Sequence, residues 1–214
     1  IIVMPENMSE ERKKIIKAFG AELVLTPAKD SIAGTIEEVR KRIAVDSSIF
    51  VLQQFENPDN PKIHYLTTGP EIWHQLDQKV DIFISGLGSG GTLAGTGKFL
   101  KEKNPNLKVI AVEPKNVSAL LGHEPGLHSI QGIGDGFVPA VLDTSLVDEV
   151  VEVTDQDAIN TARNLARIQG LLVGTSSGAN VWAASQIMKK YGEDKIIATI
   201  LADRAERYFS TALI

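Results

Sequence analysis

The sequence predicts an α/β protein with two three-layer αβα domains and mainly parallel sheets. Short apolar runs rich in Val and Ile alternate with stretches of helical periodicity, which is typical of parallel strands joined by crossover helices. The 214 residues are 43% hydrophobic and 23% charged, a composition that can bury a sizeable core. At roughly 100 to 200 residues per domain, this length allows one or two domains.

The first part of the chain is expected to be the later half of a small N-terminal domain, residues 1–57. Its predicted elements are a strand at 1–4, a helix from Ser9 to Gly20, a strand at 22–25, a helix at 31–44 and a strand at 49–52. The run Asn-Pro-Asp-Asn-Pro at 57–61 is dense in turn formers and marks a domain junction. Because the chain opens inside an apolar run without Met, we expect that an N-terminal portion of the parent protein is missing.

Residues 58–214 are expected to form the large domain. In order, the predicted elements are a helical stretch broken near Gly69-Pro70, a strand at 80–85, a helix at 92–103, a strand at 107–113, a strand at 147–153, a helix at 155–168 capped by Thr154, a short strand at 171–173, a helix at 179–191 and a strand at 196–201. Residues 115–139 lack clear periodicity and predict a long irregular loop. Loops of that length in compact domains are usually functional.

Composition excludes several classes of function. The 22 Lys and Arg against 27 Asp and Glu give a net charge of −5, which argues against a nucleic-acid-binding surface. A membrane span is not expected. Cys is absent, which removes disulfides, thiolate metal sites and a Cys nucleophile and favours a cytoplasmic location. The four His residues do not cluster in sequence, so no metal site is assigned.

The strongest local motif is the glycine-rich turn at 86–92, which follows an apolar strand and opens a helix. Free backbone N–H groups and the positive end of the helix dipole make such a turn a phosphate cradle. Gly86, Gly88 and Gly91 also satisfy G-x-G-x-x-G, and Glu113 ends the next predicted strand, as in a dinucleotide-binding fingerprint. A phosphate site of another kind and an NAD site both remain open at this point.

A second motif, Gly174-Thr175-Ser176-Ser177-Gly178, fits the nucleophile elbow of hydrolases. Every His precedes Ser176, so the order Ser, acid, His fails. We therefore interpret Ser176 as a hydroxyl that a helix start presents to a ligand, with an ordinary N-cap as the alternative. Gln54 and Phe55 follow a predicted strand, at the sheet edge where open α/β sheets bind ligands.

These motifs occur together in a specific order. The segments are Met4-Pro5-Glu6-Asn7-Met8, Leu52-Gln53-Gln54-Phe55, Thr67-Thr68-Gly69-Pro70-Glu71-Ile72-Trp73, the glycine-rich turn, Val112-Glu113-Pro114, Ile130-Gln131-Gly132-Ile133-Gly134 and Glu206-Arg207-Tyr208. Over essentially its whole length the chain resembles the cysteine synthases, or O-acetylserine sulfhydrylases, which are fold-type II pyridoxal-phosphate enzymes with the tryptophan synthase β-like fold. The cystathionine β-synthases are the nearest alternative.

The resemblance implies a role for each matching residue. It assigns the cofactor phosphate to Gly88, Ser89, Gly90, Gly91 and Thr92, the pyridine nitrogen to Ser176, and the substrate side of the cleft to Gln54, Phe55, Gly132 and Gly134. It assigns no catalytic residue, because the family's Schiff-base Lys and its Thr-Ser-Gly-Asn-Thr-Gly loop have no counterpart here. Three features depart from the family pattern: the segment Leu201-Ala202-Asp203-Arg204, Asn180, and the end of the chain at Ile214.

The implied function is the pyridoxal 5'-phosphate-dependent replacement of acetate in O-acetyl-L-serine by sulfide, giving L-cysteine. The implied partners are a second copy of the chain, as a homodimer, and serine acetyltransferase. Without the Lys, we expect the chain as written to be inactive. The alternatives are a cystathionine β-synthase-type replacement, a truncated relative that only binds a ligand or partner, and an NAD-binding Rossmann enzyme.

Overall fold

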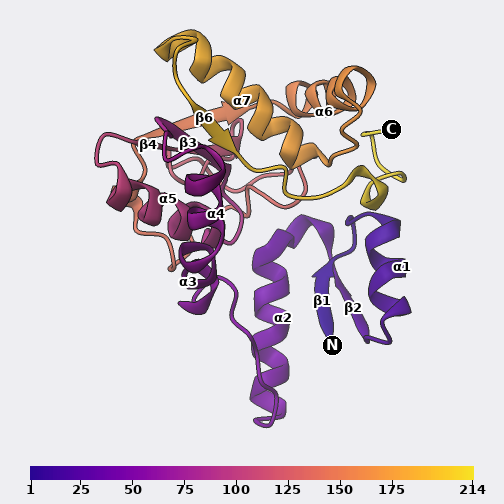
Figure 1. The fold of residues 1–214 in the computed structure, drawn as a ribbon. Coiled ribbons are helices and arrows are strands. Elements are labelled where there is room, and N and C mark those ends of the chain that lie inside the picture. The colour runs from indigo at the N-terminus through magenta and orange to yellow at the C-terminus, as the bar shows by residue number, and fades with distance from the viewer.

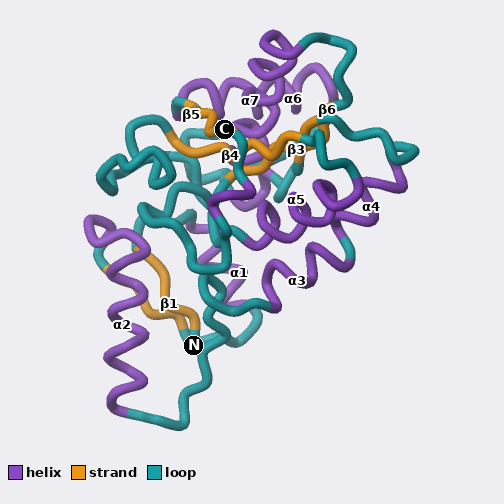
Figure 2. Tube along the Cα trace, turned by 90° about the vertical axis from the view of Figure 1, so that its left-hand side faces the viewer, coloured by secondary structure: helices purple, strands orange, loops and turns teal.

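The computed structural model describes residues 1–214 and contains two separate parallel sheets (Figure 1). The first has two strands, β1 (Ile2–Pro5) and β2 (Leu23–Thr26), with helices α1 (Glu10–Ala18) and α2 (Ser31–Val45) beside it. We call these four elements the small unit. Figure 2 shows its strands set apart from those of the larger sheet.

The large unit begins after α2 and is built on four parallel strands in the order β5-β4-β3-β6. The strands are β3 (Ile82–Gly86), β4 (Lys108–Pro114), β5 (Glu149–Val153) and β6 (Ile197–Thr199). The helices are α3 (Asp59–Leu66), α4 (Thr68–Gln75), α5 (Gly91–Lys103), α6 (Asp155–Gln169) and α7 (Thr175–Tyr191). The predicted α/β class with parallel sheets is confirmed.

Helices cover both faces of the large sheet, because its central strands are apolar on both sides. Successive side chains of a strand point to opposite faces, and β3 accordingly sends Phe83 into one buried cluster with Leu93 and Leu100 of α5. It sends Ile82 and Ile84 into a second cluster, which contains Ala179, Ala183 and Ile187 of α7. This three-layer packing brings the N-terminal ends of α5 and α7 to the carboxyl edge of the sheet.

Two predicted strands are wrong. Residues 49–52 form no strand: Phe50 is 85% and Leu52 74% exposed, and no neighbouring strand pairs with their backbone groups. Residues 171–173 form only an isolated antiparallel bridge between Val173 and Arg204. An apolar run becomes a strand only where a neighbour accepts its hydrogen bonds.

Some helix boundaries also differ from the prediction, while others are confirmed. The predicted turn at 57–61 contains the first turn of α3, where Pro58 and Pro61 are tolerated because N–H groups there lack an intrahelical partner. The break between α3 and α4 falls at Thr67 rather than at Gly69-Pro70. The helix α7 begins at Thr175, not at residue 179.

The long loop is confirmed, since residues 115–143 contain no helix or strand. Thr154 caps α6 as predicted, and Ser9, the predicted start of the first helix, caps α1; each accepts a hydrogen bond from a backbone N–H of the first turn. No helix in the structure combines the length and the apolar character needed to cross a bilayer.

Candidate functional site

The glycine-rich turn and the start of α7 line one cavity of about 150 Å³, which we call the inner cavity. It contains all six residues predicted to contact the cofactor, namely Gly88, Ser89, Gly90, Gly91, Thr92 and Ser176. Gly132 of the long loop lines it from the other side. The two sequence motifs, nearly ninety residues apart, therefore face a common space.

The glycines of this turn are required by its geometry. Gly90 has a φ of +86°, in the left-handed region, and forms the N-cap of α5. A Cβ on Gly88 would overlap the carbonyl oxygen of Gly132, and one on Gly91 would overlap the side chain of Asn60. Backbone N–H groups at the positive end of α5 thus lie open beside the cavity, an arrangement suited to an anion.

Two side chains of α3 brace the turn. Asn60 Nδ2 donates to Ser89 Oγ at 3.0 Å and to Gln54 O at 2.7 Å, which joins the glycine-rich turn to the segment containing Gln54. His64 Nε2 lies 3.2 Å from Thr92 Oγ1. Burial lowers the pKa of His64, so this ring adds no charge to the turn near neutral pH. The sequence alone indicated Asn60 only as a turn former.

The start of α7 supplies buried polar atoms without protein partners. Three buried oxygens of this helix make no hydrogen bond: Thr175 Oγ1, Ser177 Oγ and Asn180 Oδ1. Asn180 Nδ2 donates to Ile200 O at 2.8 Å, which turns Oδ1 away from that carbonyl, and Asn180 lines the inner cavity together with Ser176. Because buried polar groups are normally paired, the free Asn180 Oδ1 beside the glycine cradle fits a small polar ring that carries a phosphate. Thr175 lines the outer cavity instead, and Ser177 lines neither.

A larger cavity of about 560 Å³, the outer cavity, adjoins the inner one and shares Ser89, Gly132 and Ile133 with it. It is within the usual range for small-molecule sites. The four residues predicted on the substrate side, Gln54, Phe55, Gly132 and Gly134, all line it. Asn7, Met8 and Arg12 from the N-terminal part of the chain line it together with Gly132 and Gly134 of the long loop, so the outer cavity lies between the two units.

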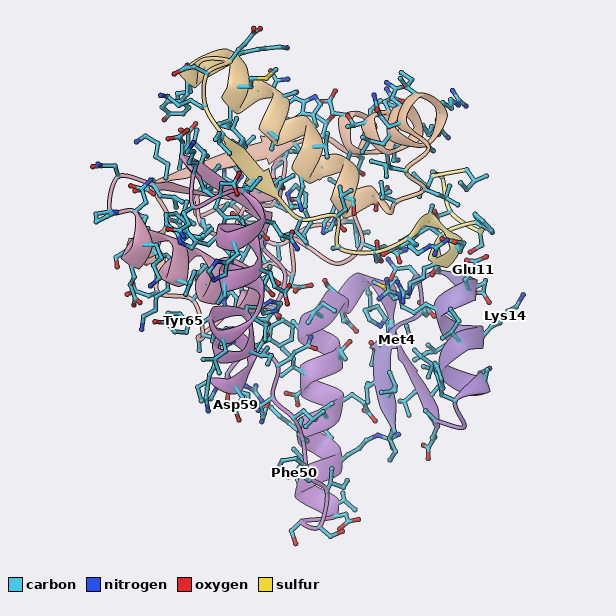
Figure 3. The ribbon with its side chains drawn as sticks, viewed as in Figure 1. Met4, Glu11, Lys14, Phe50, Asp59 and Tyr65 are labelled. Carbon is cyan, nitrogen blue, oxygen red and sulfur yellow. The ribbon has the colours of Figure 1, made fainter.

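A network of hydrogen bonds joins the small unit to the C-terminal segment. Arg12 Nη2 donates to Tyr208 OH at 2.9 Å, and Tyr208 OH donates to Asp203 Oδ2 at 2.5 Å. Burial, followed by the hydrogen bond to Asp203, raises the pKa of Tyr208. Glu11, labelled in Figure 3, lies beside the same segment, and Ser210 Oγ donates to its Oε2 at 2.6 Å.

Asp135 was also missed, although it lies within the glycine-rich part of the long loop. It lines the outer cavity, and burial raises the pKa of its carboxyl group to about 6. The only signal in the sequence was an acidic residue between Gly134 and Gly136, two glycines that both have positive φ.

Glu113 has a structural role. It is 1% exposed and accepts hydrogen bonds from the backbone N–H groups of Ala119 (3.0 Å) and Leu120 (3.2 Å), and from the hydroxyl of Ser118. Its oxygens therefore organise the start of the long loop and are not free to bind a ribose. No group of three or more His, Asp or Glu side chains is arranged to hold a metal ion.

The fold and these two cavities define an α/β protein whose parallel sheet has, at its carboxyl edge, a cavity suited to a phosphorylated small molecule. The family model described as pyridoxal-phosphate dependent enzyme matches residues 1–203, and the chain belongs to this family. The interpretation of the glycine-rich turn as an NAD site is therefore wrong, and the predicted cofactor class is confirmed.

Within this family, the chain is similar in sequence and structure to several β-replacement enzymes. The chain is 45% identical over all its 214 residues to a cysteine synthase from Staphylococcus aureus (strain Mu50), of which it spans 69%. It is 44% identical to the solved cysteine synthase of Entamoeba histolytica, with a TM-score of 0.91, covering 99% of this chain and 63% of that one. It is 40% identical to an O-acetylserine dependent cystathionine β-synthase from Helicobacter pylori, with a TM-score of 0.92, covering 99% of this chain and 69% of that one.

Proposed function

We propose that this protein is a cysteine synthase, which replaces the acetate of O-acetyl-L-serine by sulfide to give L-cysteine. The observation that carries the proposal is the meeting of the glycine-rich turn and Ser176 in the inner cavity, next to a cavity lined by Gln54 and Phe55. The 45% identity to a cysteine synthase supports the same reaction. Bound pyridoxal phosphate would supply the electron sink for breaking bonds at the substrate's α- and β-carbons.

The residues of the inner cavity have distinct proposed tasks. The backbone N–H groups of Gly88, Ser89, Gly90, Gly91 and Thr92 would hold the cofactor phosphate at the positive end of α5. The hydroxyl of Ser176 would meet the pyridine nitrogen. A neutral hydroxyl leaves that nitrogen largely unprotonated, whereas a carboxylate would favour its protonated form. Such a moderate electron sink suits a reaction in which the leaving acetate carries the electrons away.

The outer cavity would hold the amino-acid substrate. Gln54 and Phe55 are held in place from two sides: Asn60 Nδ2 binds the carbonyl of Gln54, and the Phe55 ring packs edge-on against Phe137 with centroids 5.0 Å apart. Gly132 and Gly134 present backbone without side chains across the cleft. We also propose the domain division at residue 57, which places the cleft between residues 1–57 and 58–214.

For the 214-residue chain taken alone we propose no turnover. No Lys lines either cavity, so no amine is positioned to bind the cofactor covalently or to remove the α-proton. The test is to add pyridoxal phosphate, O-acetyl-L-serine and sulfide to the purified chain and to measure L-cysteine. Robust cysteine formation by this chain would contradict the proposal, whereas tight cofactor binding without turnover would support it.

A cystathionine β-synthase-type replacement is the second candidate, favoured by the 40% identity to the Helicobacter pylori enzyme. The two reactions differ in the incoming nucleophile. A competition assay of the gene product that contains this chain, with sulfide and homocysteine at equal concentration, separates them. Mainly cysteine as product supports the first proposal, and mainly cystathionine supports the second.

We further propose a cytoplasmic homodimer that binds serine acetyltransferase. The absence of Cys supports a reducing compartment. Large apolar side chains on and after the small unit, among them Phe19, Val45 and Phe50, are more than four-fifths exposed and support association with another chain. Sedimentation velocity, with and without the acetyltransferase, tests both assemblies.

A further inference from the structure

We propose that Asp135 is a general base for the second half of the reaction, accepting the proton of a neutral thiol nucleophile as its sulfur bonds to the substrate's β-carbon. This inference rests on the proposed function and deepens it, since it concerns the nucleophile that the same cleft accepts. The residue lines the outer cavity together with Gln54, Phe55 and Gly134.

The loop that carries Asp135 is held firmly. Gly134 N donates to Leu87 O at 3.0 Å, which ties the loop to the glycine-rich turn. His128 Nε2 donates to Gly134 O at 3.0 Å. On the other side, Phe137 packs against Phe55. These contacts hold the backbone on both sides of Asp135 in place relative to the phosphate cradle, which limits how far its carboxyl group can move from the cleft.

No protein group neutralises this carboxyl group. The other titratable residues that line the outer cavity are Arg12 and His128. Arg12 donates to Tyr208 OH, and both ring nitrogens of His128 are engaged, Nε2 with Gly134 O and Nδ1 with the N–H of Ile130. Burial alone raises the pKa of Asp135, to about 6, so the group is mainly a carboxylate at neutral pH yet basic enough to accept a proton.

As the substrate's α-proton is removed, acetate leaves with the electron pair of its C–O bond and a Cα=Cβ double bond forms. The S–C bond then forms at the β-carbon while the S–H bond and the Cα=Cβ π bond break. The S–H proton goes to a carboxylate oxygen of Asp135, from which solvent later removes it, and the π electron pair moves to the α-carbon, which takes up a proton. A fixed negative charge disfavours an anionic nucleophile and favours a neutral one, so the site is suited to a protonated thiol or to neutral hydrogen sulfide rather than to a thiolate.

The test uses the gene product that contains this chain, loaded with pyridoxal phosphate, with Asp135→Asn as the variant and the exposed Asp194→Asn as its matched control. Two steps are measured separately: acetate release from O-acetyl-L-serine, and consumption of the probe thiol 2-mercaptoethanol. We expect D135N to keep acetate release and to lower kcat/KM for the thiol by roughly 10² to 10⁴-fold, the usual contribution of a general base. The control should match wild type in both steps.

The pH profile provides the second readout. In wild type, kcat/KM for the thiol should fall as pH drops below about 6, because the carboxylate becomes protonated; D135N should lose this limb and D135E should restore part of the rate. Thiol addition by D135N at the wild-type rate, or an equal loss in both steps, would overturn the role of Asp135 alone. A wild-type protein that releases no acetate would overturn the proposed function together with it.

Discussion

Placing a methyl group on Gly88 tests the packing on which the inner cavity depends. Its Cβ would overlap the carbonyl oxygen of Gly132, which is backbone and lies two residues before the hydrogen bond from Gly134 N to Leu87 O, so moving it would strain that bond. Overpacking costs about 1–3 kcal/mol, and a lost backbone hydrogen bond costs about 0.5–1.5 kcal/mol. Gly88→Ala should therefore lose about 2–4 kcal/mol of unfolding free energy, equivalent to roughly 5–15 °C in Tm.

The same substitution should weaken cofactor binding. Displacing the turn removes at least one hydrogen bond from a backbone N–H to a charged phosphate, worth about 1.5–3 kcal/mol, or about tenfold to a hundredfold in Kd. Pyridoxal phosphate titration followed by visible absorption measures this change. Gly20→Ala is the control for general destabilisation: Gly20 has a positive φ and its Cβ would meet nothing within 4 Å, so the substitution strains the backbone far from the cavity and should leave cofactor affinity unchanged. If folded G88A bound pyridoxal phosphate with unchanged affinity, the proposed role of the glycine-rich turn in binding the phosphate would be wrong.

Three further outcomes are expected. Tyr208→Phe leaves the half-buried Asp203 without its donor, and urea unfolding should show a loss of about 1–3 kcal/mol. Asn180→Ala removes an unpaired acceptor from the inner cavity together with the hydrogen bond to Ile200 O, so it should shift the absorption maximum of bound pyridoxal phosphate and lower the unfolding free energy by only about 0.5–1.5 kcal/mol. Because folding raises the pKa of Asp135 from 3.8 to about 6, its contribution to stability is lost as pH rises from 4 to 6; D135N should flatten the pH dependence of Tm over that interval.

The large sheet could be predicted because its strands are buried on both faces and so appear as continuous apolar runs. The observed strand Lys108–Pro114, for instance, lies within one residue of the predicted 107–113. Residues 49–52 have the same appearance but form no strand, since a run of apolar residues carries no information about whether a neighbouring strand exists to pair with it. Residues 49–52 form no strand because no neighbouring strand lies beside them in the fold.

The parts of the site that are local in sequence could also be predicted. Glycines at a strand-to-helix turn indicate a phosphate cradle because the mechanism needs only adjacent backbone groups. Arg12 and Tyr208, by contrast, are separated by 196 residues and meet only through the fold. Asp135 belongs to no sequence motif that indicates a function. Its raised pKa results from burial, which only the structure reveals.

The small and large units, which both line the outer cavity, differ in how many of their residues are buried in a hydrophobic core. Neither α1 nor α2 contains a buried residue, whereas β3 and β4 lie inside the main clusters. Amide hydrogens of the small unit should therefore exchange with solvent long before those of the large sheet, and proteases should cut there first. A ligand that contacts both Arg12 and Gly132 would stabilise the small unit through its contacts with the large one, so slowed amide exchange in α1 should report that the cavity is occupied.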